Sequence, residues 1–357
     1  TNSFYFFGFV PNKLPYSQDF TDSGWLKSGS TISTGFLSPE GINNASKLTA
    51  TNTDPYLLYS VSGITDLIYA ASIYIKGTST SIGKTARLWI IRDNVVFHSE
   101  DFTITNIWQR ISTTKTFTTT PTSFVSFRVD LPNTDVAVGN ETLIYGAQLE
   151  VGSYATSLIH TSGSAVTRSA DAANNAGNSD LFNDSEGVLY AEFQGLAEDG
   201  TSRTLSINNT VSNRVFMQLR SATGQVNSGV VVGGSLQGSS LSHNITQTDN
   251  IKMAFKYKAS DYALYINGSE VATQTSGSTF SAGTLNDLSF DSGDGAEDFF
   301  GKVKSVMVFK EALTDLELEK LTGYNNHELY MNYYNRLSYL GLAEEYNVES
   351  DINNYIL

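Results

Sequence analysis

The chain has 357 residues, 40% of them hydrophobic and 16% charged, so it is long enough for two domains of roughly 150 residues each. Its 36 acidic and 22 basic residues give a net charge of −14, which argues against nucleic acid and anionic membranes as partners. The absence of cysteine excludes disulfides and thiolate metal sites, and the longest apolar run, 4–10, is too short to span a bilayer.

Alternating side chains predict β-strands in the first half of the chain. Every second residue is apolar in 67–76, and the same period of two recurs in 124–130. Further strands are expected at 86–92, 107–117 and 142–150. Clusters of Gly, Pro, Asn and Ser separate these segments, which favours an antiparallel β-sandwich.

A small, polar stretch at 161–185 offers little to bury and is interpreted as a linker. A second sandwich is expected after it. Within it, Asn267 and Gly268 suit the two-residue turn of a hairpin. The alternating segments of this half are 186–194, 215–220, 226–232, 251–257, 261–275 and 302–309.

A short helix follows the last predicted strand. Thr314 and Glu317 have the spacing of a capping box, and Gly323 marks the end of the helix. The segment 327–342 has adjoining leucine and tyrosine faces at helical spacing, which predicts a second helix. This helix is expected to dock on its own domain or on a sister subunit, with connection to a further module as the alternative.

The predicted fold is all-β, with two antiparallel β-sandwich (jelly-roll) domains and a short C-terminal helical tail. The expected boundaries are an N-terminal arm at 1–13, a first sandwich at 14–160, the linker at 161–185, a second sandwich at 186–322 and the tail at 323–357.

Two long phrases carry a resemblance to known families. The first domain opens with YSQDFTDSGWLKSGSTIS and closes with LIYGAQLEVGSYATSLIHTSGSAVTRSAD, and it resembles the carbohydrate-binding-module-like jelly rolls of bacteriophage structural proteins. The second contains LYINGSEVA and FFGKVKSVMVFKEALTDLELEKL, and it is similar to the concanavalin A-like lectin/glucanase superfamily of the laminin-G type. The resemblance implies two sandwiches and contact with glycans, and it leaves the site to be argued from residues.

Sugar recognition commonly places a pyranose ring on an exposed aromatic side chain. Trp25, in the opening loop, is the preferred candidate, followed by Tyr74 and Trp89, whereas Trp108 is expected inside. A stripe formed by Lys252, Lys256 and Lys258 shares one face of a strand and is a candidate for acidic glycans, with a solvated face as the alternative.

The loop DSGDGAED supplies hard oxygen ligands of the kind that calcium prefers, which makes it a candidate metal site, with an acidic turn as the alternative. Its four acids are Asp291, Asp294, Glu297 and Asp298. Calcium is the only cofactor that the residues suggest.

No strand carries the spaced carboxylates of a glucanase, and no two of the four histidines have zinc-ligand spacing, so the protein is not expected to be an enzyme.

The hypothesis is a non-catalytic virion structural or attachment protein, on a phage tail or particle surface, that binds host-surface or environmental polysaccharide. Its partners would be glycans and other virion proteins. A homo-oligomer, in particular a trimer, is expected because multivalency strengthens weak sugar sites. The alternatives are a polysaccharide-degrading enzyme or its accessory region, a purely architectural capsid or tail decoration protein, and a secreted protein of a bacterial surface.

Overall fold

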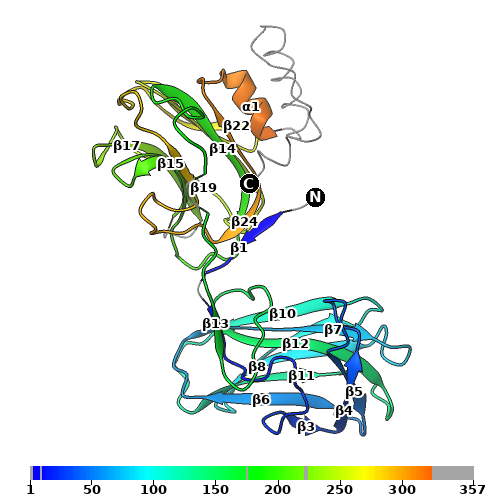
Figure 1. Cartoon of the computed structure of the whole chain (residues 1–357). Coiled ribbons are helices and arrows are strands. Elements are labelled where there is room, and N and C mark those ends of the chain that lie inside the picture. Colours follow the sequence, from blue (N-terminus) through cyan, green and yellow to red (C-terminus); the bar gives the residue numbers. More distant parts are fainter. Residues whose placement is uncertain (1–2, 9, 174–175, 221–223, 324–357) are drawn as a thin grey trace. The chain divides into compact units, whose positions relative to one another are not determined.

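The computed structural model describes residues 3–8, 10–173, 176–220 and 224–323. They form antiparallel β-sheets and one short helix, so the predicted all-β class is confirmed. The chain divides into two compact units, Gly8–Ala170 and a second unit that combines residues up to Phe7 with those from Asp171 onward. We refer to them as the first and second sandwich (Figure 1).

One sheet of the first sandwich consists of β2 (Val10–Asn12), β4 (Ser30–Phe36), β5 (Ala45–Ala50), β7 (Ile68–Gly77), β10 (Gln109–Thr116), β12 (Glu141–Val151) and β13 (Val166–Arg168). Its main order is β10-β7-β12-β2-β13, while β5 pairs with both β12 and β4. The other sheet has the order β3-β6-β11-β8-β9. Its strands are β3 (Leu26–Ser28), β6 (Tyr56–Ser62), β8 (Thr85–Arg92), β9 (Val96–Thr103) and β11 (Phe124–Asp130).

The apolar residues of the predicted alternation fill the space between these two sheets. Tyr69 and Ile73 from β7 lie in one buried cluster with Phe127 and Val129 from β11. The same cluster includes Leu88 from β8. The predicted inward faces of 67–76 and 124–130 are therefore confirmed, and the alternate side chains of both strands face outward.

The second sandwich also has two sheets. The first is ordered β1-β24-β14-β20-β21-β22 and the second β18-β17-β16-β15-β23, with β19 paired to β17. The strands of the first are β1 (Phe4–Phe6), β14 (Glu186–Gly195), β20 (Ile251–Lys258), β21 (Tyr262–Ile266), β22 (Ser269–Gln274) and β24 (Gly301–Phe309). Those of the second are β15 (Arg203–Thr210), β16 (Asn213–Leu219), β17 (Gln225–Val232), β18 (Ser235–Leu236), β19 (Leu241–Asn244) and β23 (Asp287–Ser289).

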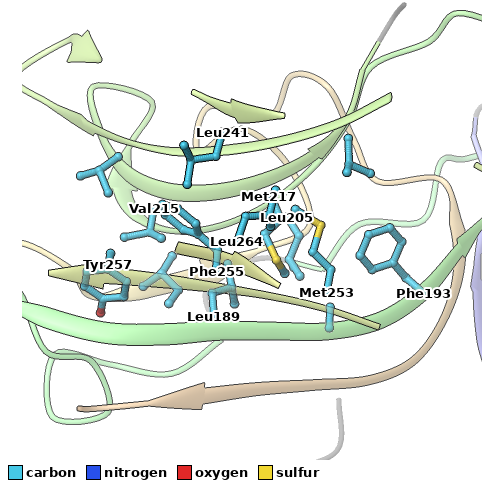
Figure 2. Packing of buried hydrophobic residues seen from close by; sticks show 14 of the residues in the cluster. Leu189, Phe193, Leu205, Val215, Met217, Leu241, Met253, Phe255, Tyr257 and Leu264 are labelled. Atoms are coloured by element: carbon cyan, nitrogen blue, oxygen red, sulfur yellow. The ribbon is translucent and has the colours of Figure 1, made fainter. Parts of the chain in front are cut away.

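Figure 2 shows the core between these sheets, where Leu189, Met253 and Phe255 face Leu205 and Met217. Every second residue of β20 from Ile251 to Tyr257 belongs to this core, as the alternation predicts. The hairpin turn is confirmed too, because Asn267 and Gly268 both have positive φ, 50° and 87°.

The helix α1 (Asp315–Gly323) packs on the outer side of the first of these sheets. Leu318 and Leu321 lie in one buried cluster with Tyr190 and Tyr265, whose side chains face away from the main core. The Thr314 amide donates to the Glu317 carboxylate at 2.9 Å, and the Glu317 amide donates to the Thr314 hydroxyl at 3.4 Å. The predicted capping box is confirmed. The helix predicted at 327–342 lies outside the described residues.

The expected N-terminal arm and linker both supply strands. The arm contributes β1 to the second sandwich and β2 to the first, and the linker contributes β13. The Phe7 amide donates to the Asp171 carboxylate at 2.8 Å, and the Asp171 amide donates to the Phe7 carbonyl at 2.9 Å. No helix among the described residues is long and apolar enough to cross a membrane.

Candidate functional site

Trp89 lies on the outer side of the first sandwich, in the middle of a five-stranded sheet. Its neighbours Leu88 and Ile90 are fully buried in the core, so the alternation of β8 turns the indole outward, and the ring is half-buried. Trp89 lies opposite Arg128 of β11, which in turn lies opposite Leu58 of β6. Three strands therefore place side chains in one row across this face.

Guanidinium groups and aromatic rings lie next to one another across these strands. The Arg128 guanidinium lies 3.8 Å from the ring centroid of Tyr56 and 5.6 Å from that of Trp89. The Arg87 guanidinium lies 5.5 Å from the Trp89 centroid. These separations fall in the range of cation–π attraction. We call the outward side chains of Tyr56, Leu58, Arg87, Trp89 and Arg128 the Trp89 face.

Asp130 fixes the orientation of this face from beneath. The Trp89 Nε1 donates to Asp130 Oδ2 at 2.8 Å, and the Arg128 Nε donates to Asp130 Oδ1 at 2.6 Å. Asp130 is 4% exposed, and burial raises the pKa of its carboxyl against the opposing effect of the two hydrogen bonds. One carboxylate thus holds both the indole and the guanidinium in place.

The cations of the Trp89 face are paired within the face. The Arg87 Nη2 donates to Asp101 Oδ2 at 2.7 Å, and its Nε donates to the other carboxylate oxygen. That hydrogen bond lowers the pKa of Asp101 and raises the pKa of Arg87. Arg128 pairs with Asp130 and, at 3.5 Å, with the exposed Asp54. The face therefore presents aromatic surface and hydrogen-bonding groups with its charges matched.

Exposed apolar side chains flank the row. Leu26 of β3 lies opposite Leu58 and is 53% exposed, and Phe97 of β9 is 57% exposed. Large apolar side chains at the surface are common, but here they border a half-buried indole on one sheet.

Tyr74 lies on the opposite side of the same sandwich. It belongs to β7, and the alternation of that strand turns it away from the core that it shares with β8. Arg110 lies 5.5 Å from its ring centroid, and Tyr145 lies across from it on β12. The fold therefore does not bring Tyr74 and Trp89 into one site.

Hydrogen-bonded polar side chains surround Tyr74. The Tyr145 hydroxyl donates to Glu40 at 2.5 Å and accepts hydrogen bonds from the amides of Gln18 and Asn44. Burial and the Glu40 carboxylate raise the pKa of Tyr145. His160 Nε2 lies 2.9 Å from Glu40. This network ties three loop segments to the sheet, although the Asn44 Oδ1 and the Arg110 Nε have no hydrogen-bond partner among the described residues.

The expectation that Trp25 is the exposed ring is wrong. Its ring is 2% exposed and packs against Phe20, Tyr59 and Phe127 with centroids 5.1–5.7 Å apart. Its Nε1 donates to the Tyr16 carbonyl at 3.0 Å, so even its polar atom is used internally. Trp108, expected inside, is half-buried.

The three lysines of β20 face outward as predicted, but acids of the fold meet them. Lys258 pairs with Glu186 at 2.7 Å, and Lys252 lies opposite Glu192 on β14. Lys256 is 7% exposed and pairs with Asp261 and Asp315 at 3.0 and 3.5 Å. The stripe therefore does not offer a row of open cations to an acidic glycan.

The carboxylates of the predicted calcium loop are used in its own turn and on the sheet beneath it. Asp291 accepts from the Gly293 amide, Asp294 accepts from the Ser292 hydroxyl, and Glu297 accepts from the Thr204 hydroxyl at 3.0 Å. In the part of the chain that the structure describes, no group of three or more His, Asp or Glu side chains is arranged to hold a metal ion. These acids therefore do not converge on a calcium site.

Sequence reasoning missed four members of the Trp89 face, Leu58 among them. Arg87 is two residues before Trp89 on the same strand, so its shared orientation was readable from the alternation. Tyr56 and Arg128 join them only through the register of β6, β11 and β8, which the sequence does not reveal.

No family model and no curated protein matches the chain. Solved structures similar to part of it include a xylan-binding CBM22-1 domain of Paenibacillus barcinonensis, with 13% identity and a TM-score of 0.29 over 40% of this chain and 92% of that domain. The homodimeric agglutinin CG-16 from chicken liver has 11% identity and a TM-score of 0.26 over 39% of this chain and 99% of that chain.

A match to an exo-β-agarase, at 8% identity and a TM-score of 0.30, covers 40% of this chain and 26% of that one. The structural neighbours are thus carbohydrate-binding modules, galectins and glycosidase domains. At these identities and scores the function has to be argued from the residues of this chain.

Proposed function

We propose that the first sandwich binds a neutral polysaccharide, without catalysis, on the Trp89 face. The observation that carries the proposal is the fixed row of aromatic and guanidinium groups that Asp130 holds on the outer side of a rigid sheet. A pyranose ring would lie on the indole through its apolar CH groups. The hydroxyls of neighbouring sugars would exchange hydrogen bonds with Arg87, Asp101 and Asp54 at the edges.

Rigidity is an advantage for such a ligand. Each side chain that a ligand must immobilise costs about 0.5–1.5 kcal/mol, and this cost falls when the contact groups are already held in place. Trp89 and Arg128 are held by hydrogen bonds that exist without ligand. A weak sugar contact therefore loses little of its free energy to ordering the protein.

The paired charges favour a neutral ligand. An acidic glycan would need cations that are free to bind it, whereas Arg87 and Arg128 each have a carboxylate partner at 2.7 Å or less. Bringing another carboxylate to this face would set it against Asp54, Asp101 and Asp130.

The same carboxylates are poorly suited to glycoside hydrolysis, which needs an acid and a second carboxylate that both reach the scissile bond. Both oxygens of Asp130 accept hydrogen bonds from side chains of the face, and Asp101 is engaged by Arg87. These acids therefore position the indole and the guanidinium groups of the Trp89 face.

The place of the protein on a phage tail or particle surface is the part of the proposal that rests on the sequence resemblance alone. A chain assembled as a homo-oligomer, such as a trimer, would display several copies of the Trp89 face and gain avidity through multivalency. A secreted protein of a bacterial surface would use the same face in the same way.

The test is binding of the full chain to soluble neutral glucans and xylans by affinity electrophoresis. Trp89→Ala is expected to weaken binding at least tenfold, which corresponds to about 1.4 kcal/mol. Tyr74→Ala is the matched control, because it removes a half-buried ring from the opposite side of the same sandwich and should leave the affinity unchanged.

Equal losses in both variants, or a loss only in Tyr74→Ala, would overturn the assignment of the face. Release of reducing ends from any of these polysaccharides by the wild-type chain would overturn the non-catalytic part of the proposal.

A further inference from the structure

The second sandwich has a polar outer surface on the sheet that contains β15, β16 and β17. Leu205, Met217 and Val226 point into the core, so the residues between them face outward. We call five of these outward residues the β16 face: Thr204 of β15, Arg214, Phe216 and Gln218 of β16, and Asn227 of β17. Thr204 is fully buried and Phe216 is 6% exposed, so part of the chain covers them.

The loop 291–298 provides this cover. The Arg214 Nη1 donates to the Ser292 carbonyl at 2.8 Å, and the Thr204 amide donates to the Glu297 carbonyl at 2.8 Å. Near the start of the loop, the Ser206 hydroxyl donates to the Asp291 carbonyl, also at 2.8 Å. Both ends of the loop are therefore hydrogen-bonded to the outer side of the sheet.

Glu297 places its carboxylate on the β16 face. One of its oxygens accepts from the Gln218 Nε2 at 2.7 Å and from the Thr204 Oγ1 at 3.0 Å. The residue itself is exposed and has a φ of +55°, in the left-handed region that a side chain such as Glu rarely adopts. The hydrogen bonds of the loop hold Glu297 in this unfavourable conformation, so release of the loop from the sheet would relieve the strain.

The face also holds two buried polar atoms without a hydrogen-bond partner. One is the side-chain oxygen of Asn227, a residue that is 8% exposed and lies directly opposite Gln218. The other is the Nε of Arg214. Orphaned polar atoms are rare in folded proteins. One of these atoms requires a donor and the other an acceptor, which a ligand bearing both hydroxyls and a carboxylate would supply.

Arg214 lies near acidic side chains of the loop 291–298. Burial lowers the pKa of the guanidinium, and the carboxylates of Glu297 and Asp294 oppose that shift. A ligand that removed Glu297 from this face would therefore have to bring its own negative charge.

We infer that the β16 face is a binding site for a carboxylate-bearing saccharide, such as a uronic acid unit, and that Glu297 occupies it in the absence of ligand. In the bound state the loop 291–298 lifts, and the sugar carboxylate takes the hydrogen bonds of Thr204 and Gln218. A sugar hydroxyl then donates to Asn227. This site lies in the other unit of the chain and takes a different ligand from the Trp89 face.

The closed loop weakens apparent affinity in proportion to the small fraction of molecules in which it is open. Removing the Glu297 carboxylate is therefore expected to strengthen binding. The experiment measures binding of tetragalacturonate to the full chain by isothermal titration calorimetry. Glu297→Ala should bind at least tenfold more tightly than the wild type, and adding Arg214→Ala to that variant should abolish the gain.

Asp294→Asn is the matched control, because it removes the same charge from the same loop but does not contact Thr204 or Gln218 in the described structure. It should bind as the wild type does. If Glu297→Ala does not fold, Glu297→Gln retains the side-chain length and is judged by the same criteria. Amide exchange in 291–298 should increase when wild-type protein is saturated with the ligand.

Three results would each overturn the inference: equal binding by Glu297→Ala and the wild type, an equal gain in Asp294→Asn, or an equal gain for a neutral xylotetraose or an acidic peptide. Loss of neutral-polysaccharide binding in Trp89→Ala is a separate result, so failure of one proposal does not imply failure of the other.

Discussion

The Trp89 face and the β16 face are both outer sides of β-sheets, yet their polar side chains find hydrogen-bond partners in different parts of the chain. On the Trp89 face the side chains pair with one another across strands, and the face stays open. On the β16 face a loop folds back, and its Glu297 supplies the acceptor that the sheet lacks. An outward orientation therefore does not by itself make a residue available to a ligand.

The largest expected effect is a difference in stability between two tryptophan variants of the first sandwich. Trp25→Ala should destabilise the first sandwich by about 3–5 kcal/mol, because it empties a buried site between three aromatic rings. Trp89→Ala should cost only about 1–2 kcal/mol, since the half-buried ring loses one charged hydrogen bond and its cation–π contacts.

Urea unfolding followed by tryptophan fluorescence measures both effects. All three tryptophans of the chain lie in the first sandwich, so the signal reports on that unit alone. Equal destabilisation by the two substitutions would mean that Trp89 is a core residue and that the open face is misassigned.

A smaller loss of stability is expected from Asp130→Ala, which tests whether Asp130 holds the side chains of the Trp89 face in place. Removing two charged hydrogen bonds from Trp89 and Arg128 should cost about 2–3 kcal/mol. Sugar affinity should fall although no proposed sugar contact has been deleted. Asp54→Ala is the control, because this exposed partner of Arg128 should contribute less than about 1 kcal/mol. Intact affinity in Asp130→Ala would contradict the role given to preorganisation.

The smallest effect is a difference in pH dependence between two carboxyl groups, Asp291 of the loop 291–298 and Asp101 beside the Trp89 face. Burial raises the pKa of Asp291 in the loop, so its contribution to stability is greatest below the ordinary value of 3.8 and is lost as the pH rises through the raised value. The hydrogen bond from Arg87 lowers the pKa of Asp101, whose contribution is present above 3.8 and is lost as the pH falls through the lowered value.

Native-state amide exchange, expressed as protection factors between pH 3 and 7, measures the stability of each sandwich separately. Asp291→Asn should flatten the pH dependence of the second sandwich and Asp101→Asn that of the first. Slopes of the same sign for both residues would show that the pKa values of these two carboxyl groups are not shifted in opposite directions.

Much of the fold could be predicted from the sequence because a period of two survives in long strands. β11 matches its predicted range of 124–130, and the capping box at Thr314 is a local signal. β15 was not predicted, because only two apolar residues, Leu205 and Ile207, alternate with polar ones along it. The pairing of β1 with β24 joins segments about 300 residues apart, which local patterns do not report.

The candidate site was less predictable than the fold. Trp108 shares its orientation with Arg110, since Ile111 and Thr113 face inward, so the alternation of β10 already opposed placing it in the core. Trp25 precedes its strand, and only the contacts of its ring show where it points. Cross-strand partners, such as Glu186 for Lys258 or Asp130 for Trp89, depend on register and lie beyond single-sequence reasoning.

The second sandwich takes strands from both sides of the first: β1 pairs with β24, and the 163 residues Gly8–Ala170 between β1 and the rest of the second sandwich form the first sandwich. Phe7 and Asp171, which flank that insertion, exchange hydrogen bonds with each other. The first sandwich is therefore an insertion in the second, and the residues just before and just after it are hydrogen-bonded to each other. Recombination at these two adjacent junctions could exchange the first sandwich for another domain, and the second sandwich would retain every strand of its own.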